Sequence, residues 1–447
     1  MLRWRISNLR VIKGFAPAKQ ALSRPIPTEF YSVSPAVKKG LKEKFGTDDP
    51  EQAVRKIVSE VRDRGDRALF DLTLKIDGIK LATLEVSKEQ IANARQKADE
   101  ALVSALKLAA GRIEAFHRVQ KNNIWHEIAG ADSGQLIRPL ERVGIYVPGG
   151  TASYPSTVLM TAIPARVAGV KEIILVTPPK SDGAVSPATL VAADIAAVDR
   201  IFSLGGAQAI AALAYGTESI PRVDKICGPG NIFVVLAKKL VYGAVDIDGL
   251  HGPSEVLIIA DEKAEPEYCA ADLLAQAEHD PLASAILITT SLSFADEVNK
   301  EMTQQLKSLS RQAIAAESLD RGIIAIVDSL DEAVELANLY APEHLLLMVE
   351  NAASYLGKIT NAGCVIVGRD ATVVLGDYVA GPSHVLPTGG TARFSSALNI
   401  TDFIKFINTI TVDKAGLQKL GKAASVMARA EGFDGHAQAI EKRLTAD

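Results

Sequence analysis

Short apolar runs that end in glycine or polar turns recur from Arg142 onward, and each is followed by a segment with helical periodicity. Several runs are apolar at almost every position, which is typical of parallel strands covered on both faces. The segments between them are long enough for crossover helices. The runs are Val143–Val147, Ile173–Val176, Val256–Ile259, Ala285–Thr289, Ile323–Val327 and Cys364–Val367. This pattern predicts an α/β fold with two doubly wound sheets.

The N-terminal quarter of the chain has helical periodicity instead. Asp49 can cap a helix over residues 49–64, in which Pro50 takes the first position and apolar residues recur every three or four positions. Ser87 starts a second helical stretch that continues to about His117. A chain of 447 residues is too long for one hydrophobic core, so we expect roughly two or three packed units.

Charge and cysteine content exclude several classes of protein. Charged residues make up 23% of the chain and the net charge is −4, without long blocks of one sign, so no nucleic-acid partner is expected. Cys227, Cys269 and Cys364 are far apart and form no C-x-x-C motif, which argues against a disulfide framework or a thiolate metal cage. A reducing, cytoplasmic location fits this cysteine content.

Residues 1–28 are basic and contain no acidic residue, since Glu29 is the first. An organellar transit peptide has a similar charge pattern, but a solvated basic arm is the simpler interpretation. The chain has neither the continuous apolar segment of a secretion signal nor an apolar run of roughly 18 residues. No membrane partner is therefore expected.

Three glycine turns follow predicted strands. They are Pro148-Gly149-Gly150, Gly205-Gly206-Ala207-Gln208 and Gly228-Pro229-Gly230-Asn231. In open α/β sheets, ligands bind beyond the carboxyl ends of the strands, where such turns bring backbone N–H groups close to a phosphate or ribose. None of the three completes the G-x-G-x-x-G dinucleotide motif, so ordinary strand-to-helix turns are the alternative.

Glu343 and His344 form the sharpest polar pair in the chain. Pro342, directly before them, favours a break in regular structure, so that two adjacent side chains can face one cavity. A carboxylate beside an imidazole can divide two proton transfers between them. A solvent-exposed Glu-His pair at the start of a helix is the alternative interpretation.

Other polar residues have the chemistry of metal ligands. Gln276 and His279 share one face of a predicted helix, although Gln-x-x-His is also a common surface pattern. Asp377 and His384 stand among glycine and proline, which indicates either a loop at the end of a strand or a turn-capping aspartate. Gly432–Gly435 interrupt a C-terminal helical segment directly before His436.

Four of these residues would form a nitrogen and oxygen metal site without thiolate if the fold brings them together. They are Gln276, His279, Asp377 and His436. Zinc is the expected metal, with manganese or cobalt as possible substitutes. Such a metal would hold and orient a substrate while a nicotinamide carries the electrons.

In their order along the chain, these motifs resemble the histidinol dehydrogenase family. The matching motifs are Arg142–Gly150, Gly205–Ala212, Gly228–Asn231, Gly252–Glu255, Gln276–His279, Ala341–His344, Gly376-Asp377 with His384, and Glu431-Gly432 with His436. The resemblance covers about residue 40 to the end of the chain. The ordered set is highly specific, although no single motif is.

The resemblance implies that one zinc ion per subunit is shared across a homodimer. Its ligands would be Gln276, His279, Asp377 and His436, with His436 reaching in from the other subunit. The substrate would also contact these four ligands. Three further residues would complete the substrate site, namely Ser254, His344 and Glu431.

The resemblance also implies the chemistry. Tyr146, Gln208 and Asn231 match positions that contact NAD. His344 matches the general base, and Glu343 matches the residue that activates water. The expected reaction is the NAD-dependent oxidation of L-histidinol through L-histidinal to L-histidine, which ends histidine biosynthesis, and holding the aldehyde between the steps would prevent its loss.

The fold implied by the resemblance is a pair of incomplete Rossmann-like domains with small helical terminal segments, in an intertwined dimer. Residues 43–145 and 254–398 would form the first domain, for metal and substrate, and residues 146–253 the second, for NAD. Residues 1–42 would form an arm that packs with residues 399–424. Residues 425–447 would form a tail that reaches the partner subunit.

His251 departs from the family pattern, because a small residue is expected directly before Gly252. An extra imidazole close to Ser254 would favour a different substrate. The alternative function is therefore a related zinc and NAD dehydrogenase that acts on another small alcohol, such as a sulfonated diol. A ligand-binding relative without turnover is a further alternative, against which the presence of Glu343 and His344 argues.

Overall fold

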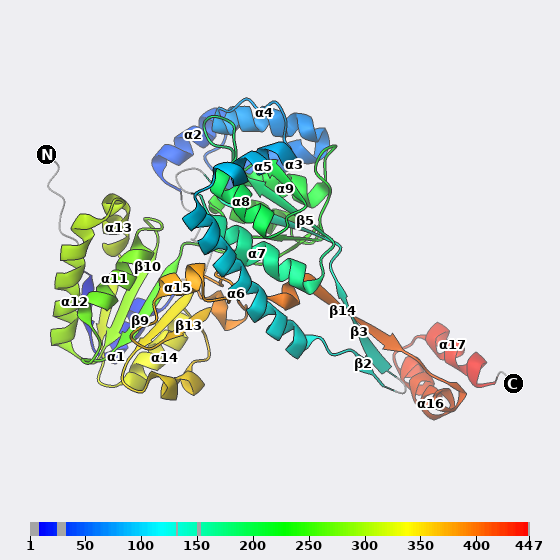
Figure 1. The fold of residues 1–447 in the computed structure, drawn as a ribbon. Helices are drawn as coiled ribbons and strands as arrows, with labels where there is room; N and C mark the ends of the chain where they lie inside the picture. Colours follow the sequence, from blue (N-terminus) through cyan, green and yellow to red (C-terminus); the bar gives the residue numbers. More distant parts are fainter. Residues whose placement is uncertain (1–8, 25–32, 131–132, 150–152, 446–447) are drawn as a thin grey trace.

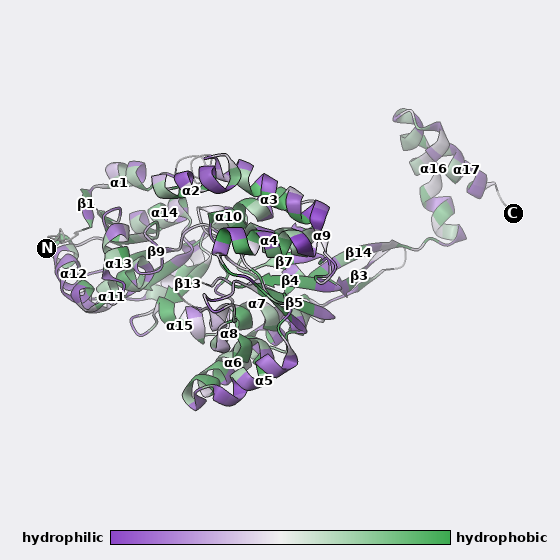
Figure 2. Cartoon of the chain, turned by 90° about the horizontal axis from the view of Figure 1, so that it is seen from above, coloured by the Kyte–Doolittle hydropathy of each residue, from purple (hydrophilic) through white to green (hydrophobic). Residues whose placement is uncertain are grey.

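The computed structural model describes residues 9–24, 33–130, 133–149 and 153–445 (Figure 1). Two parallel sheets are each covered by helices, and a small antiparallel sheet leads from them to the C-terminal helices. The strands of the two large sheets are apolar, whereas the surrounding helices carry hydrophilic residues on their outer sides (Figure 2). The prediction of an α/β fold with two parallel sheets is confirmed.

The larger sheet has six parallel strands in the order β1-β11-β10-β9-β12-β13. Its strands are β1 (Arg10–Lys13), β9 (Glu255–Ala260), β10 (Ser284–Thr289), β11 (Ile323–Ile326), β12 (His344–Met348) and β13 (Cys364–Val367). One face is covered by α11 (Pro266–Ala277), α12 (Leu292–Gln305) and α13 (Gln312–Leu319), and the other by α1 (Phe15–Leu22) and α14 (Leu330–Tyr340). The short helix α15 (Val373–Tyr378) follows β13.

The second sheet has five parallel strands in the order β6-β5-β4-β7-β8. Its strands are β4 (Arg142–Tyr146), β5 (Glu172–Thr177), β6 (Arg200–Ser203), β7 (Lys225–Cys227) and β8 (Asp246–Ile247). One face is covered by α5 (Lys88–Lys97), α6 (Glu100–Ile124), α7 (Pro155–Ala168) and α8 (Pro187–Ile195). The other is covered by α3 (Pro50–Arg64), α4 (Asp66–Asp77), α9 (Gly206–Tyr215) and α10 (Ile232–Val241), with α2 (Pro35–Phe45) beside α3.

The helices of the N-terminal quarter differ from expectation in two ways. The single stretch expected from Ser87 is two helices, because Ala98 is extended and the Asp99 side chain caps α6 at Ala101 N. The expected division placed residues 43–145 with the six-stranded sheet, yet α3 to α6 pack against the five-stranded sheet. Their apolar stripes pack on α7 to α10, the helices that cover the two faces of this sheet.

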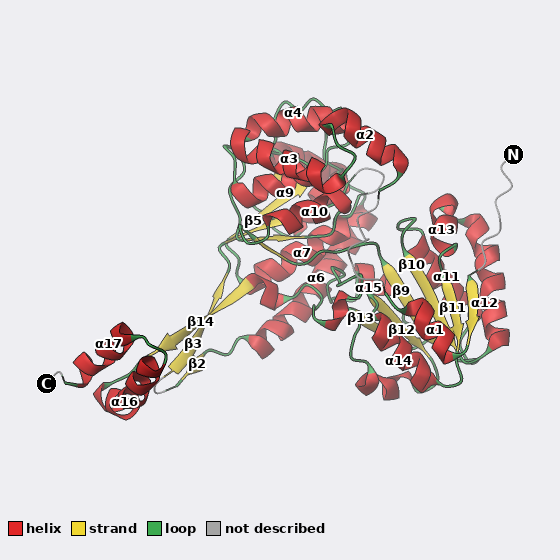
Figure 3. Cartoon of the chain, turned by 180° about the vertical axis from the view of Figure 1, so that it is seen from behind, coloured by secondary structure: helices red, strands yellow, loops and turns green. Residues whose placement is uncertain are grey.

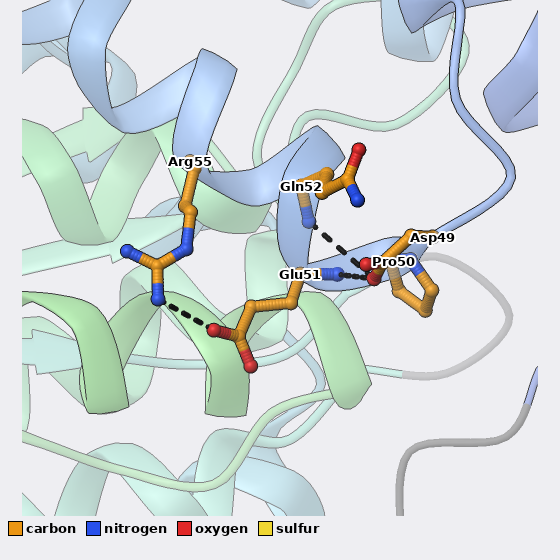
Figure 4. Close-up of a pocket in the computed structure, with 5 residues that line it drawn as sticks. All are labelled: Asp49, Pro50, Glu51, Gln52 and Arg55. Carbon is orange, nitrogen blue, oxygen red and sulfur yellow. Dashed lines mark hydrogen bonds and ion pairs between the residues drawn. The ribbon is translucent and has the colours of Figure 1, made fainter.

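The start of α3 follows the sequence closely (Figure 4). The Asp49 carboxylate accepts hydrogen bonds from the backbone N–H groups of Glu51 and Gln52, and Pro50 occupies the first position. Arg55 forms an ion pair with Glu51 one turn earlier, at 2.6 Å. These contacts are local, which explains why the sequence predicts this helix start correctly.

The C-terminal part of the chain projects away from both parallel sheets (Figures 1 and 3). Strands β2 (Ile128–Ala129), β3 (Ser133–Pro139) and β14 (Ile404–Ile410) form the antiparallel sheet, and α16 (Lys414–Ala430) and α17 (Asp434–Leu444) lie beyond it. Short 3-10 helices span Leu306–Ser308, Ala352–Lys358, Thr391–Arg393 and Ile400–Phe403. None of the described helices is long and apolar enough to cross a membrane.

The N-terminal arm completes the six-stranded sheet at one edge. Residues 10–13 pair in parallel with β11, and α1 packs against α14. The expected packing of residues 1–42 with residues 399–424 stays a prediction, and residues 1–8 and 25–32 lie outside the described residues.

A buried ion pair holds the end of the five-stranded sheet together. Asp248, directly after β8, pairs with Lys238 of α10, and both side chains are almost fully buried. The second carboxylate oxygen of Asp248 accepts the Gly228 N–H at 2.6 Å. The Lys238 ammonium donates to the Gly228 carbonyl oxygen at 3.0 Å. Burial would raise the pKa of Asp248, but Lys238 and His251 hold it below its usual range.

We predict that Asp248→Ala lowers the free energy of unfolding by about 3–5 kcal/mol, because Lys238 then stays buried without its partner. The double variant Lys238→Met, Asp248→Leu should cost less, since it removes both charges. Urea unfolding at neutral pH measures both losses. A loss for Asp248→Ala no larger than that of the double variant would contradict this account of the pair.

Candidate active site

Glu343 and His344 lie where α14 gives way to β12. Ala341, after the last residue of α14, has a positive φ of 53°, and Pro342 keeps the turn from continuing the helix. Glu343 is 6% exposed and His344 is 4% exposed. The solvent-exposed alternative for this pair is therefore wrong.

Both side chains of the pair contact the backbone of the same residue. The Glu255 N–H donates to Glu343 Oε2 at 2.7 Å, and His344 Nδ1 lies 3.2 Å from the Glu255 carbonyl oxygen. His344 Nδ1 lies 3.7 Å from Glu343 Oε2. The expectation that two adjacent side chains face one place agrees with this geometry.

The buried pair has strongly shifted pKa values. Burial raises the pKa of Glu343 to about 8, although the neighbouring His344 opposes the shift. Burial would lower the pKa of His344, but the carboxylates of Glu343 and Asp377 outweigh it and raise that pKa to about 9. Displaced pKa values of this kind are common at catalytic sites.

Asp377 lies in α15 and approaches the Glu343–His344 pair from there. The sequence predicted a loop at this position, but the structure has a short helix. Asp377 Oδ1 lies 3.4 Å from His344 Nε2. His384 Nδ1 lies 2.7 Å from the Asp377 carbonyl oxygen, and its Nε2 lies 3.1 Å from Thr157 Oγ1 of α7. His384 therefore links Asp377 to the helix that follows the first strand of the five-stranded sheet.

Gln276 lies in the last turn of α11, whereas His279 lies in the turn directly after it, because the helix ends at Ala277 and does not reach His279 as predicted. Gln276 is 2% exposed, and its Oε1 is buried with no hydrogen-bond partner among the described residues. Burial would raise the pKa of Asp377, but His344, His384 and His279 together hold it below its usual value. The fold thus gathers His279 and Asp377 around the Glu343–His344 pair.

The remaining expected metal ligand lies elsewhere in the chain. His436 is exposed on α17, where its ring centroid lies 5.1 Å from that of Phe433, and Glu431 is exposed at the end of α16. In Figures 1 and 3, α17 stands far from α15 and β12. Within the described part of one chain, no three His, Cys, Asp or Glu side chains gather to hold a metal.

The donor set of one chain nevertheless fits part of a metal site. The orphaned Gln276 Oε1 is a buried acceptor that needs a hydrogen-bond donor or a cation. His279 and Asp377 add the nitrogen and oxygen donors that zinc accepts. These three residues supply part of the donor set of such a site.

Two of the three expected NAD contacts lie at the carboxyl ends of the five-stranded sheet. Tyr146 ends β4, its hydroxyl accepts the Gly206 N–H at 3.2 Å, and burial raises its pKa to about 12. Gln208 is 1% exposed, and both of its amide atoms lack hydrogen-bond partners among the described residues. An amide buried without partners fits a position that a polar ligand satisfies.

Asn231 has a local role that its position in the sequence also explains. Its Oδ1 caps α10 by accepting from Phe233 N and Val234 N. Gly228, at the start of the same turn, has a φ of +111°, and a Cβ there would lie 2.1 Å from the Tyr146 carbonyl oxygen. The turn therefore packs directly on the end of β4. Gly150 lies outside the described residues.

His251 contacts Asp248, the residue whose carboxylate accepts the Gly228 N–H. Its Nδ1 lies 2.8 Å from the Leu386 carbonyl oxygen, and its Nε2 lies 3.4 Å from Asp248 Oδ2. Ser254 is half-buried directly before β9. The extra imidazole thus links the end of the five-stranded sheet to residue 386, which explains the departure from the family pattern structurally.

Sequence reasoning missed two residues that support these sites. Asp248 holds the Gly228 turn, and Glu255 holds the Glu343–His344 pair. Glu255 closes the Gly252–Glu255 motif, so its place in that motif was a usable signal. Asp248 had none, because its partners are ten and twenty residues away and the spacing follows no helix or strand period.

The chain is similar to histidinol dehydrogenases over nearly its whole length. A family model described as histidinol dehydrogenase matches residues 41–444. Histidinol dehydrogenase of Dehalococcoides mccartyi strain CBDB1 is 56% identical over 437 residues, which are 98% of this chain and 100% of that protein. Histidinol dehydrogenase of Halalkalibacterium halodurans is 51% identical over 402 residues, which are 89% of this chain and 95% of the relative.

A solved structure agrees with these relatives. The crystal structure of histidinol dehydrogenase from Elizabethkingia anophelis matches with a TM-score of 0.89 and 36% sequence identity, and the match covers 98% of both chains. Fold, motif order and sequence identity thus agree along the chain. The chain belongs to the histidinol dehydrogenase family, whose members are oxidoreductases.

Proposed function

We propose that the chain catalyses the NAD-dependent, four-electron oxidation of L-histidinol through L-histidinal to L-histidine, the last steps of histidine biosynthesis. Relatives at 56% and 51% identity are named histidinol dehydrogenase. The observation that carries the proposal is the buried Glu343–His344 pair beside Asp377. A carboxylate and an imidazole in one site match a reaction with two different proton acceptors.

His344 is the base that accepts the alcohol proton. Its Nδ1 faces the Glu255 carbonyl, which can only accept a hydrogen bond, so the neutral ring carries its hydrogen on Nδ1. Nε2, which lies 3.4 Å from Asp377 Oδ1, is then the nitrogen that accepts the proton, and the Asp377 carboxylate stabilises the protonated ring. In the second oxidation, His344 accepts the proton of the hydrated aldehyde in the same way.

Glu343 activates the water that attacks the aldehyde. Its Oε2 is occupied by the Glu255 N–H, which fixes the orientation of the carboxylate. Burial raises the pKa of this carboxyl to about 8, so its ionised form is a stronger base than an exposed glutamate. Glu343 can therefore activate water while its neighbour His344 accepts the substrate's protons.

Zinc would be held by Gln276, His279 and Asp377 of one subunit and by His436 of the partner subunit. The buried, unpartnered Gln276 Oε1 and the exposure of His436 support this ligand set. When bound, zinc would hold the amine and imidazole nitrogens of the substrate. Ser254 and the partner subunit's Glu431 would complete the substrate site.

NAD would bind at the five-stranded sheet, whose fold we interpret as an incomplete Rossmann-like domain. The unpartnered amide of Gln208 and its neighbour Tyr146 support this place, with Asn231 at the next turn. This place would supply hydride acceptance in both oxidations, with one NAD⁺ for the alcohol and, after exchange, a second NAD⁺ for the hydrated aldehyde. The link from His384 to Thr157 ties this sheet to Asp377.

The projecting C-terminal part supports a homodimer with shared sites. Apolar side chains are exposed on both β14 and the terminal helices, and exposed apolar patches mark interaction surfaces. They are Phe406, Ile407, Ile410, Leu420, Val426, Met427 and Phe433, which are between 43% and 82% exposed. Covering this surface with a second copy would also bring a His436 to each site.

The alternative substrate, another small alcohol such as a sulfonated diol, has less support. It rested on His251, whose imidazole contacts Asp248 and residue 386. The relatives reported above are all named histidinol dehydrogenase. The cytoplasmic location and the choice of zinc over manganese or cobalt stay predictions.

We predict that mixing His436→Ala and His344→Ala subunits restores activity that neither variant has alone. In a mixed dimer with shared sites, one site collects both lesions and the other keeps a complete set of residues. The measurement is NADH formation from histidinol after verified subunit exchange. No recovery at all would contradict the shared site, and a mixture of each variant with itself is the control.

We predict that the rate of alcohol oxidation falls as pH drops through the pKa of His344, because the protonated ring cannot accept a proton. The carboxylates of Glu343 and Asp377 raise this pKa, so Glu343→Gln should move the acidic limb to lower pH. Rates between about pH 5 and about pH 10, a range that includes both the ordinary histidine pKa and the raised value, measure the limb. An acidic limb at the same pH in both proteins would contradict the assignment.

We predict two NADH per histidinol consumed, with Glu343 needed mainly for the second. Glu343→Gln keeps the side-chain size but removes the base, so aldehyde oxidation should fall by about 10²–10⁴-fold and alcohol oxidation by less. His344→Ala should slow both steps. Separate rates from histidinol and histidinal test this. One NADH per histidinol in the unmodified protein would refute the four-electron reaction, and equal losses in Glu343→Gln would refute the division of labour.

A further inference from the structure

Glu255 is the residue on which the orientation of the catalytic pair depends. Its N–H and its carbonyl contact Glu343 and His344, so any shift of its backbone displaces both side chains. Its carboxylate is 5% exposed and accepts the Gly389 N–H at 3.1 Å. This carboxylate needs a cationic partner, because a buried charge without one is strongly destabilising.

The partner comes from the N-terminal arm. Arg24 donates from Nη1 to Glu255 Oε1 at 2.6 Å and from Nη2 to Oε2 at 2.7 Å. Two parallel, charge-assisted hydrogen bonds of this kind fix the plane of the carboxylate as well as its charge. The arm therefore reaches the residue that holds the catalytic pair.

Arg24 also contacts the end of α14, directly before the turn that leads to Glu343 and His344. Its Nε donates to the Tyr340 carbonyl oxygen at 2.8 Å, and its guanidinium lies 3.7 Å from the centroid of the Tyr340 ring. Tyr340 is the last residue of α14, directly before Ala341 with its positive φ. The Arg24 guanidinium thus connects two segments. One is the strained turn before Glu343, and the other is the start of β9, where Glu255 contacts the pair.

We propose that Arg24 is a positioning residue for the Glu343–His344 pair, which it acts on through Glu255 and the Tyr340 carbonyl. This gives the basic arm a part in the reaction, although Arg24 precedes the segment 41–444 that the family model matches. The inference rests on the proposed roles of Glu343 and His344. Arg24 touches none of the residues assigned to zinc or NAD in the contacts of the described chain.

The test compares Arg24→Ala with a control variant, Lys19→Ala. The control removes an exposed ion pair between Lys19, on the same arm, and Glu335. We expect Arg24→Ala to lower kcat for both histidinol and histidinal by about 10–100-fold, a modest fraction of what losing a general base costs. KM, zinc content and dimerisation should change little. Millimolar guanidinium ion should restore part of kcat, whereas the same concentration of sodium ion should not.

A readout other than activity separates positioning from general stability. Hydrogen–deuterium exchange at residues 341–345 should rise in Arg24→Ala and stay unchanged in Lys19→Ala. Arg24→Lys, which keeps the charge but loses the two parallel bonds, should lie between the unmodified protein and Arg24→Ala in kcat. If Arg24→Ala fails to fold, the double variant Arg24→Met, Glu255→Gln removes both charges and replaces it, with the same expected loss of kcat.

Several outcomes would overturn the proposal. An unchanged kcat in a folded Arg24 variant would do so, and so would equal losses of kcat, zinc and dimer without rescue by guanidinium. These results differ from a failure of the proposed function. In that case the unmodified protein would not produce NADH from histidinol, whatever residue stands at position 24.

Discussion

The hydrogen bonds from the backbone of Glu255 to Glu343 and His344 are the contacts on which the rest of the site depends. They exist because β12 pairs in parallel with β9, with His344 opposite Val256. The parallel register places the amino ends of both strands together, and α14 delivers the chain there through a turn with positive φ. Burial raises the pKa of Glu343, whereas the carboxylates of Glu343 and Asp377 raise the pKa of His344 against the effect of burial.

The candidate site residues lie at opposite ends of the two parallel sheets. Tyr146, Gly206 and Gly228 stand at the carboxyl ends of β4, β6 and β7, as expected for ligand sites in α/β sheets. Glu343 and His344 stand instead at the amino end of β12. The two ends are joined where His384 lies between Asp377 and Thr157 of α7. This junction brings the proposed hydride acceptor on one sheet near the proposed base on the other.

Buried charges account for how loops and termini are attached to this framework. Asp248 neutralises Lys238 and holds the Gly228 turn, while Arg24 neutralises Glu255 and holds the end of α14. In each case one charged group satisfies a partner charge and a backbone group together. Removing a single member leaves the other charge buried without compensation, which gives these contacts their structural weight.

Local chemistry was enough to predict much of this protein from its sequence. The apolar strands, the Asp49 cap and the adjacency of Glu343 and His344 follow from neighbours in the chain, and the ordered motifs identify the family. Only the tertiary structure decided which sheet the helices of residues 50–124 cover, that Asp377 approaches His344, and that Arg24 reaches Glu255. These facts depend on contacts between residues far apart in sequence, and neither propensity nor periodicity carries information about such distances.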